Sequence, residues 1–65
     1  MSWTLKNKIG QAVISTGQTD AQAKTAFIAE QAVSDYSQTY TEANVDEMIA
    51  DRDKLVIGSK IFYRE

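Results

Sequence analysis

The 65-residue chain contains no cysteine, no histidine and no proline, and only three glycines. Without cysteine it can form no disulfide, and without cysteine or histidine a structural zinc site loses its usual ligands. Disulfides and zinc are the common supplements to the thin core of a domain shorter than about 70–80 residues. The remaining way to stabilise so small a core is to oligomerise or to dock onto a partner. We therefore expect the chain to assemble with another protein or with itself.

The missing residue types also remove most catalytic arrangements. An imidazole base and a thiolate nucleophile both need residues that the chain lacks. The three glycines, Gly10, Gly17 and Gly58, are isolated, so no glycine-rich loop can hold phosphates. A chain of this length also has little material for a closed pocket. We predict that it is not an enzyme and that it uses no cofactor and no small-molecule substrate.

Four carboxylates between residues 46 and 53 raise the question of a metal site. The segment Asp51-Arg52-Asp53 matches the start of a calcium-binding loop. That pattern needs a ligand at its fifth position and glycine at its sixth, where this chain has Leu55 and Val56. The match fails, and we interpret the carboxylates as a solvated helix face without a metal.

No apolar run approaches the ~20 residues that span a bilayer. Near the amino terminus, Lys6 and Lys8 follow the first apolar residues and Gly10 breaks the run, unlike the basic-then-apolar plan of a signal peptide. Hydrophobic residues make up 43% of the chain and charged residues 25%, which is ordinary for a folded domain. We therefore expect one soluble, cytoplasmic globular domain over residues 1–65, without membrane contact.

The first segment, residues 2–16, has apolar residues at the spacing of one helix stripe: Leu5, Ile9, Ala12 and Val13. Ser2 is a candidate N-cap, and Gly17 stands where a left-handed glycine commonly ends a helix. Gly10 inside the segment costs roughly 1 kcal/mol relative to alanine. We predict a helix here, with the alternative that Trp3-Thr4-Leu5 forms a short strand.

Two further helices are predicted from their start signals. Thr19 and Gln22 form a capping box that begins a helix over residues 20–36, with Asp20 in its first turn. Residues 37–40 form a polar connector. Thr41 then begins a third helix that fades around residues 51–53, although Thr39 and Glu42 offer a competing capping box two residues earlier.

The C-terminal segment changes to β-branched and aromatic residues on both sides of Gly58-Ser59. Glycine at the first central position suits a two-residue type II′ turn. The predicted hairpin register pairs Ile57 with Lys60, Val56 with Ile61 and Leu55 with Phe62. An isolated hairpin is marginal in water, so one of its faces must pack on the helices.

These elements predict a small α+β fold of three helices followed by a C-terminal β-hairpin, with the second helix central and a possible third strand at Trp3–Leu5. The predicted core consists of Leu5, Ile9, Val13, Phe27, Val33, Tyr36, Val45, Met48, Ile49, Leu55 and Phe62.

The predicted function is that of a protein-interaction module, such as an assembly component, adaptor or inhibitor, acting through an acidic helix and an exposed hairpin. The predicted partner-binding residues are Glu42, Asp46, Glu47, Asp51, Asp53 and Tyr63. Aromatic residues are enriched where binding energy concentrates, which is why Tyr63 is included. The composition, rich in Ala, Gln, Ser and Thr, also resembles that of small phage-encoded proteins, so a virion component is one form that this function could take.

The alternative is a winged-helix DNA reader, in which the third helix enters the major groove and the hairpin forms the wing. Its predicted nucleic-acid contacts are Arg52, Lys54, Lys60 and Arg64. The third helix argues against this alternative because its side chains are mainly acidic and phosphates repel them.

Overall fold

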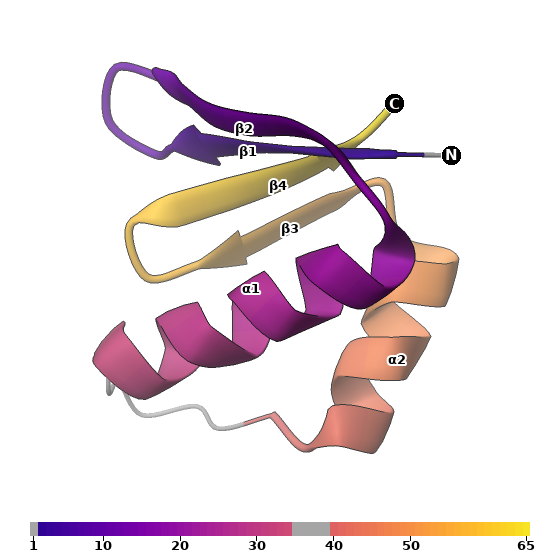
Figure 1. Ribbon diagram of the computed structural model, residues 1–65. Helices are drawn as coiled ribbons and strands as arrows, with labels where there is room; N and C mark the ends of the chain where they lie inside the picture. Colours follow the sequence, from indigo (N-terminus) through magenta and orange to yellow (C-terminus); the bar gives the residue numbers. More distant parts are fainter. Residues whose placement is uncertain (1, 35–39) are drawn as a thin grey trace.

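A four-stranded antiparallel sheet with two helices on one side makes up the described part of the chain, residues 2–34 and 40–65 of a computed structural model (Figure 1). The elements in chain order are β1 (Trp3–Asn7), β2 (Val13–Gln18), α1 (Asp20–Ser34), α2 (Glu42–Asp51), β3 (Lys54–Ile57) and β4 (Lys60–Arg64). Across the sheet the strand order is β2-β1-β4-β3. The first and last strands of the chain are therefore the central pair of the sheet.

The prediction of three helices is wrong, because residues 2–16 lie in a β-hairpin and its turn. Gly10 and Gln11 reverse the chain between β1 and β2 with φ values of 76° and 54°. Such left-handed backbone is incompatible with a continuous right-handed helix. The stripe that suggested a helix consists of only four residues, and strand pairing with β4 outweighs it. The possible strand at Trp3–Leu5 forms the greater part of β1.

Gly17 does not end a helix. It lies inside β2 with a φ of 67°, next to a shift in register between Trp3 and Leu5 of the neighbouring strand. A Cβ atom at this position would have no neighbour within 4 Å, so space does not require glycine. The left-handed backbone of a bulge in β2 is the reason that glycine suits the position.

The C-terminal hairpin confirms its predicted register. Ile57 pairs with Lys60, Val56 with Ile61 and Leu55 with Phe62. Gly58 has a φ of 54° at the first position of the two-residue turn, as the turn chemistry demands. On its other side β4 pairs with β1, so that Leu5 lies opposite Phe62, and the amide of Glu65 donates to the carbonyl of Ser2 at 2.8 Å.

Both helix starts also follow from local sequence. The hydroxyl of Thr19 accepts from the Gln22 amide at 3.2 Å, and the Gln22 side chain accepts from the Thr19 amide at 2.9 Å. Thr41 caps α2 in the same reciprocal way, with Asn44 as its partner. The competing start at Thr39 lies outside the described residues.

The core forms where the two helices meet one face of the sheet. It consists of Trp3, Leu5, Ala23, Phe27, Val45, Ile49, Leu55 and Phe62, with Met48 packed against it. Three predicted core residues are instead exposed: Ile9 to 90%, Val13 to 57% and Val33 to 81%. Ile9 and Val13 lie at the surface because their segment is a hairpin and its turn. Val33 lies in the last turn of α1. Tyr36 lies outside the described residues.

Trp3 joins three elements in this core. Its side chain is fully buried, and its indole N–H donates to Asp20 Oδ1 in the first turn of α1 at 2.8 Å. The Arg64 guanidinium of β4 lies 4.8 Å from the centroid of the indole ring. A tryptophan buries its polar N–H at low cost only when a partner accepts it, and Asp20 is that partner.

Candidate binding face of the sheet

The two faces of the sheet differ in what covers them. Side chains alternate between faces along a strand, so Trp3 and Leu5 point toward the helices while Thr4 and Lys6 point away from them. Both described helices lie on the same side of the sheet (Figure 1). Within residues 2–34 and 40–65, the other side is covered by no helix or strand, and we call it the open face.

An aromatic side chain lies between two lysines on the open face. The ammonium groups of Lys6 on β1 and Lys54 on β3 lie 5.3 Å and 5.8 Å from the ring centroid of Tyr63 on β4. At these distances the ring quadrupole attracts both cations. Beside them the Thr4 hydroxyl donates to Glu65 Oε1 at 2.6 Å.

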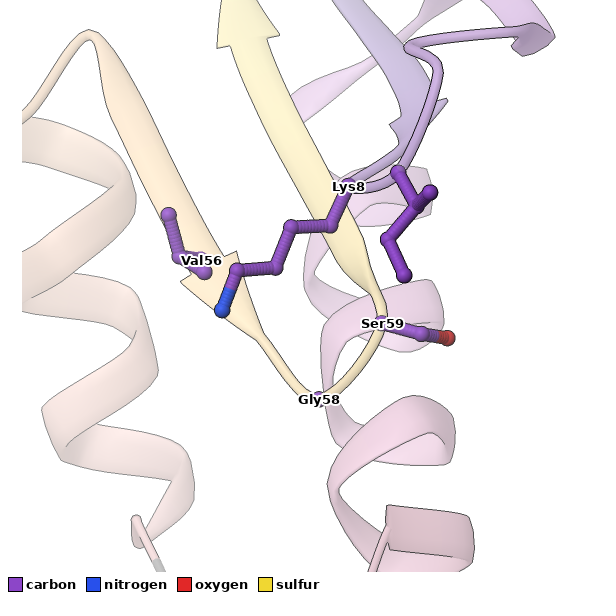
Figure 2. Close-up of a pocket in the computed structure, with 5 residues that line it drawn as sticks. Lys8, Val56, Gly58 and Ser59 are labelled. Carbon is purple, nitrogen blue, oxygen red and sulfur yellow. The ribbon is translucent and has the colours of Figure 1, made fainter.

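A third lysine reaches the open face from the turn after β1. The Lys8 amide donates to the carbonyl of Ser59 at 2.8 Å and joins the two hairpin turns. Figure 2 shows the Lys8 side chain extending across β4 toward Val56. Lys8, Ile9, Val56, Gly58 and Ser59 line a shallow hollow at this end of the sheet. The hollow combines apolar side chains with one cation, the ammonium group of Lys8.

Apolar side chains complete the open face. Val13, opposite Lys6 on β2, is 57% exposed, and Val56 on β3 is 46% exposed. Ile61 lies between Lys6 and Val56 in the ladder and is buried by its neighbours. We use the name basic face for the set Lys6, Lys8, Lys54, Tyr63, Val13 and Val56.

Charge is divided between the two sides of the molecule. The described helices carry six carboxylates: Asp20, Glu30, Glu42, Asp46, Glu47 and Asp51. The basic face, on the opposite side of the sheet, carries three lysines, and beside them lies one carboxylate, Glu65, which accepts from Thr4. The small net charge of −2 therefore hides an acidic layer of helices behind a basic sheet surface.

The predicted acidic site is partly occupied by contacts within the chain. The Lys24 ammonium of α1 lies 3.0 Å from Asp46 and 3.6 Å from Glu42. Asp53 lies 3.9 Å from the Arg64 guanidinium. Glu47 and Asp51 are exposed on α2, whereas Tyr63 belongs to the other side of the molecule. The structure does not bring the six residues together, and their binding of a partner stays a prediction.

The pairing with α2 perturbs Lys24. Its hydrogen bond to Asp46, supported by the charges of Asp46 and Glu42, raises the pKa of Lys24 above its usual range. Because the folded pKa exceeds the unfolded one, the stabilisation is complete below the unfolded pKa and is lost as the pH rises through the folded pKa. We expect a side-chain NMR titration to give a lower Lys24 midpoint in Asp46→Asn. The matched change Glu47→Gln, one residue along the same helix, is expected to leave it unchanged; equal shifts in both variants would contradict a specific contact.

The four basic residues predicted for DNA also separate. Lys54 lies on the basic face, and Arg52 is exposed at the end of α2. Lys60 and Arg64 point to the helical side, where Lys60 lies 4.0 Å from Glu30 and Arg64 stacks on Trp3. With two helices in place of three, the winged-helix arrangement that motivated this site is absent from the described chain.

Sequence reasoning missed Lys6 and Lys8, because both were placed in a helix. Had residues 3–7 been read as a strand, alternation would have placed Lys6 on the face opposite Trp3 and Leu5, whereas Lys8 lies in the turn that follows.

Comparison with protein-family models, curated proteins and solved structures finds no match to this chain. Among residues 2–34 and 40–65, no group of three or more His, Cys, Asp or Glu side chains is placed to hold a metal ion. None of the helices in these ranges is long and apolar enough to cross a membrane.

Proposed function

We propose that this chain is a non-enzymatic protein-interaction module whose basic face binds an acidic segment of another protein. The observation that carries the proposal is the position of Lys6, Lys8 and Lys54, from three separate points of the sequence, on the one sheet face that neither described helix covers. Half-exposed Val13 and Val56 lie on the same face. A surface of this kind offers apolar contact area within a rim of positive charge.

A protein partner fits this surface better than a nucleic acid does. Proteins that bind single strands stack bases on exposed aromatic faces. Here the Tyr63 ring already has an ammonium group within 6 Å from each of two neighbouring strands, Lys6 at 5.3 Å and Lys54 at 5.8 Å. The acidic helices also weaken long-range attraction to a polyanion. Valine side chains, which recognise neither phosphates nor base edges, instead favour contact with apolar side chains of a protein.

The charges and the apolar residues have different roles in this binding. Exposed ion pairs contribute about 0.2–1 kcal/mol each, so three lysines select and orient an acidic partner more than they hold it. Burial of Val13 and Val56 supplies the part of the affinity that salt does not screen. Binding is therefore expected to weaken with added salt without disappearing.

The basic face is preferred to the acidic helix as the site because fewer of its charges are neutralised within the chain. On α2, Glu42 and Asp46 share Lys24 as a counter-ion. On the sheet, Lys6 and Lys54 contact the aromatic ring of Tyr63 and not a carboxylate.

The test is an NMR titration of the labelled chain with a soluble acidic peptide of alternating glutamate and valine. We expect amide shifts at Lys6, Lys8, Lys54 and Tyr63, and an affinity that falls as salt is raised from about 0.05 M to about 0.5 M, where the screening length shortens severalfold.

Two double variants with equal charge change control this experiment. Lys6→Gln with Lys54→Gln removes two charges from the basic face and is expected to weaken peptide binding about five-fold, the effect of two exposed ion pairs. Arg52→Gln with Lys60→Gln removes two charges elsewhere and is expected to leave binding nearly unchanged. Equal losses in both, or tighter binding of a single-stranded oligonucleotide than of the peptide, would refute the proposal.

A further inference from the structure

The two edges of the sheet are built differently. The edge strand β3 has four residues and begins with exposed Lys54. The edge strand β2 has six residues, Val13–Gln18, with no charged side chain and no proline. Val13 and Ile14 near its start are 57% and 46% exposed.

An edge strand presents unpaired backbone N–H and C=O groups that can pair with another strand. Proteins commonly protect such edges by keeping them short, by placing lysine on them, by adding proline or by bulging the strand. The strand β3 has the first two of these protections, and β2 has only the last. Shifts in register on both sides of the Leu5–Ser15 pair bulge β2, one near Gly17 and one between Val13 and Ser15, so residues 13–16 form an uncharged but irregular edge segment.

We propose that residues 13–16 of β2 pair antiparallel with the same residues of a second copy of the chain. A two-fold axis brings each surface of the molecule against itself, so like charges on that surface repel. The helical layer is acidic and the basic face is cationic, whereas β2 carries no charge that could meet its own copy. A second copy is thus the occupant that the charge distribution favours at this edge.

The small core of the chain is a second reason to expect this dimer, because association would add buried surface and so stabilise the fold. A chain of this size buries only about 60% of the surface that its unfolded form exposes, and oligomerisation is a usual supplement. Pairing at β2 satisfies backbone N–H and C=O groups of the edge and covers part of Val13 and Ile14, which are each about half exposed.

The proposed pairing extends the sheet from one copy of the chain into the other. Antiparallel pairing about an axis normal to the sheet joins the two four-stranded sheets into one of eight strands. Both pairs of helices then lie on one side, and the two basic faces form one continuous surface on the other. The dimer contact shares Val13 with the basic face but is uncharged, so its response to salt differs from that of the proposed binding of an acidic segment.

Sedimentation equilibrium of the purified chain, without any acidic ligand and at both low and high salt, tests the dimer. We expect a reversible dimer whose dissociation constant changes little with salt. Salt insensitivity separates this result from the proposed peptide binding, which weakens with salt, so either proposal can fail without the other. A monomer at every attainable concentration overturns the dimer.

Two variants locate the interface. Ile14 on β2 and Val56 on β3 are equally exposed, at 46% each, and replacement by lysine adds the same charge to either edge. Ile14→Lys is expected to weaken the dimer at least ten-fold, whereas Val56→Lys is expected to leave it nearly unchanged. Circular dichroism confirms that each variant is folded. Equal weakening by the two variants, or weakening by Val56→Lys alone, places the contact elsewhere and overturns the proposal.

Hydrogen exchange gives a readout that does not rely on substitution. Amides of residues 13–16 that point away from β1 are expected to exchange more slowly as the protein concentration is raised through the dissociation constant. Exchange at these amides that is independent of concentration, in a solution where sedimentation shows dimers, would rule out pairing through β2.

Discussion

Replacing Phe27 with alanine is expected to lower the free energy of unfolding by about 3–5 kcal/mol, the usual cost of truncating a buried phenylalanine. The Phe27 side chain is fully buried in α1. Its ring centroid lies 5.9 Å from that of Tyr40 before α2 and 5.9 Å from that of Phe62 on β4. The substitution therefore leaves a cavity where both helices meet the sheet. Since small domains have about 5 kcal/mol to lose, the variant should be largely unfolded at room temperature.

Urea denaturation followed by circular dichroism measures this loss, with Val33→Ala as the matched control. Val33 belongs to the same helix but is 81% exposed, so its truncation should change stability by no more than about 0.5 kcal/mol. A Phe27→Ala variant as stable as the parent chain would show that α1 packs in a different register.

Replacing Trp3 with alanine is expected to lower the free energy of unfolding by a similar amount, about 3–5 kcal/mol. The fully buried indole fills the core at β1 and also holds Asp20 and Arg64. Its loss removes apolar contact from the central strand pair and leaves the first turn of α1 without its link to the sheet. We expect cooperative unfolding at a much lower urea concentration, measured by circular dichroism because the variant lacks the single tryptophan of the chain.

A second pair of variants separates the hydrogen bond from the packing. Trp3→Phe keeps an aromatic ring but has no donor for Asp20, and its expected cost is about 1–3 kcal/mol, including the smaller ring. Combined with Asp20→Ala, the loss should be smaller than the sum of the two single losses, because both remove the same 2.8 Å contact. Strict additivity would mean that the indole N–H and Asp20 do not stabilise one another.

The elements that could be predicted from sequence depend on neighbours within a few residues. The capping box of Thr19 and Gln22 uses side chains three positions apart, and its hydrogen bonds form as predicted. The turn at Gly58-Ser59 sets the pairing of β3 with β4 because a two-residue loop permits only one register. Phe27 and Ile49 are buried as predicted, since each continues the apolar stripe of a correctly assigned helix.

Residues 2–16 were assigned wrongly because their local signals conflict. The spacing of Leu5 and Ile9 suits a helix, while the β-branched residues from Val13 onward suit a strand. The conflict is decided by pairing of β1 with β4, in which Leu5 meets Phe62 across 57 positions of sequence. No local pattern contains such a contact.

By itself, the sequence determined the helix starts, the C-terminal turn and the absence of disulfide and histidine chemistry, because each depends on residue type or short-range geometry. Only the tertiary structure decided that the N-terminal segment enters the sheet, and hence that Lys6 and Lys8 join Lys54 on one face while Lys60 and Arg64 turn toward the helices. The physical reason is that side chains alternate along a strand. The face on which a charge lies is known only after long-range pairing has set both the element and its register.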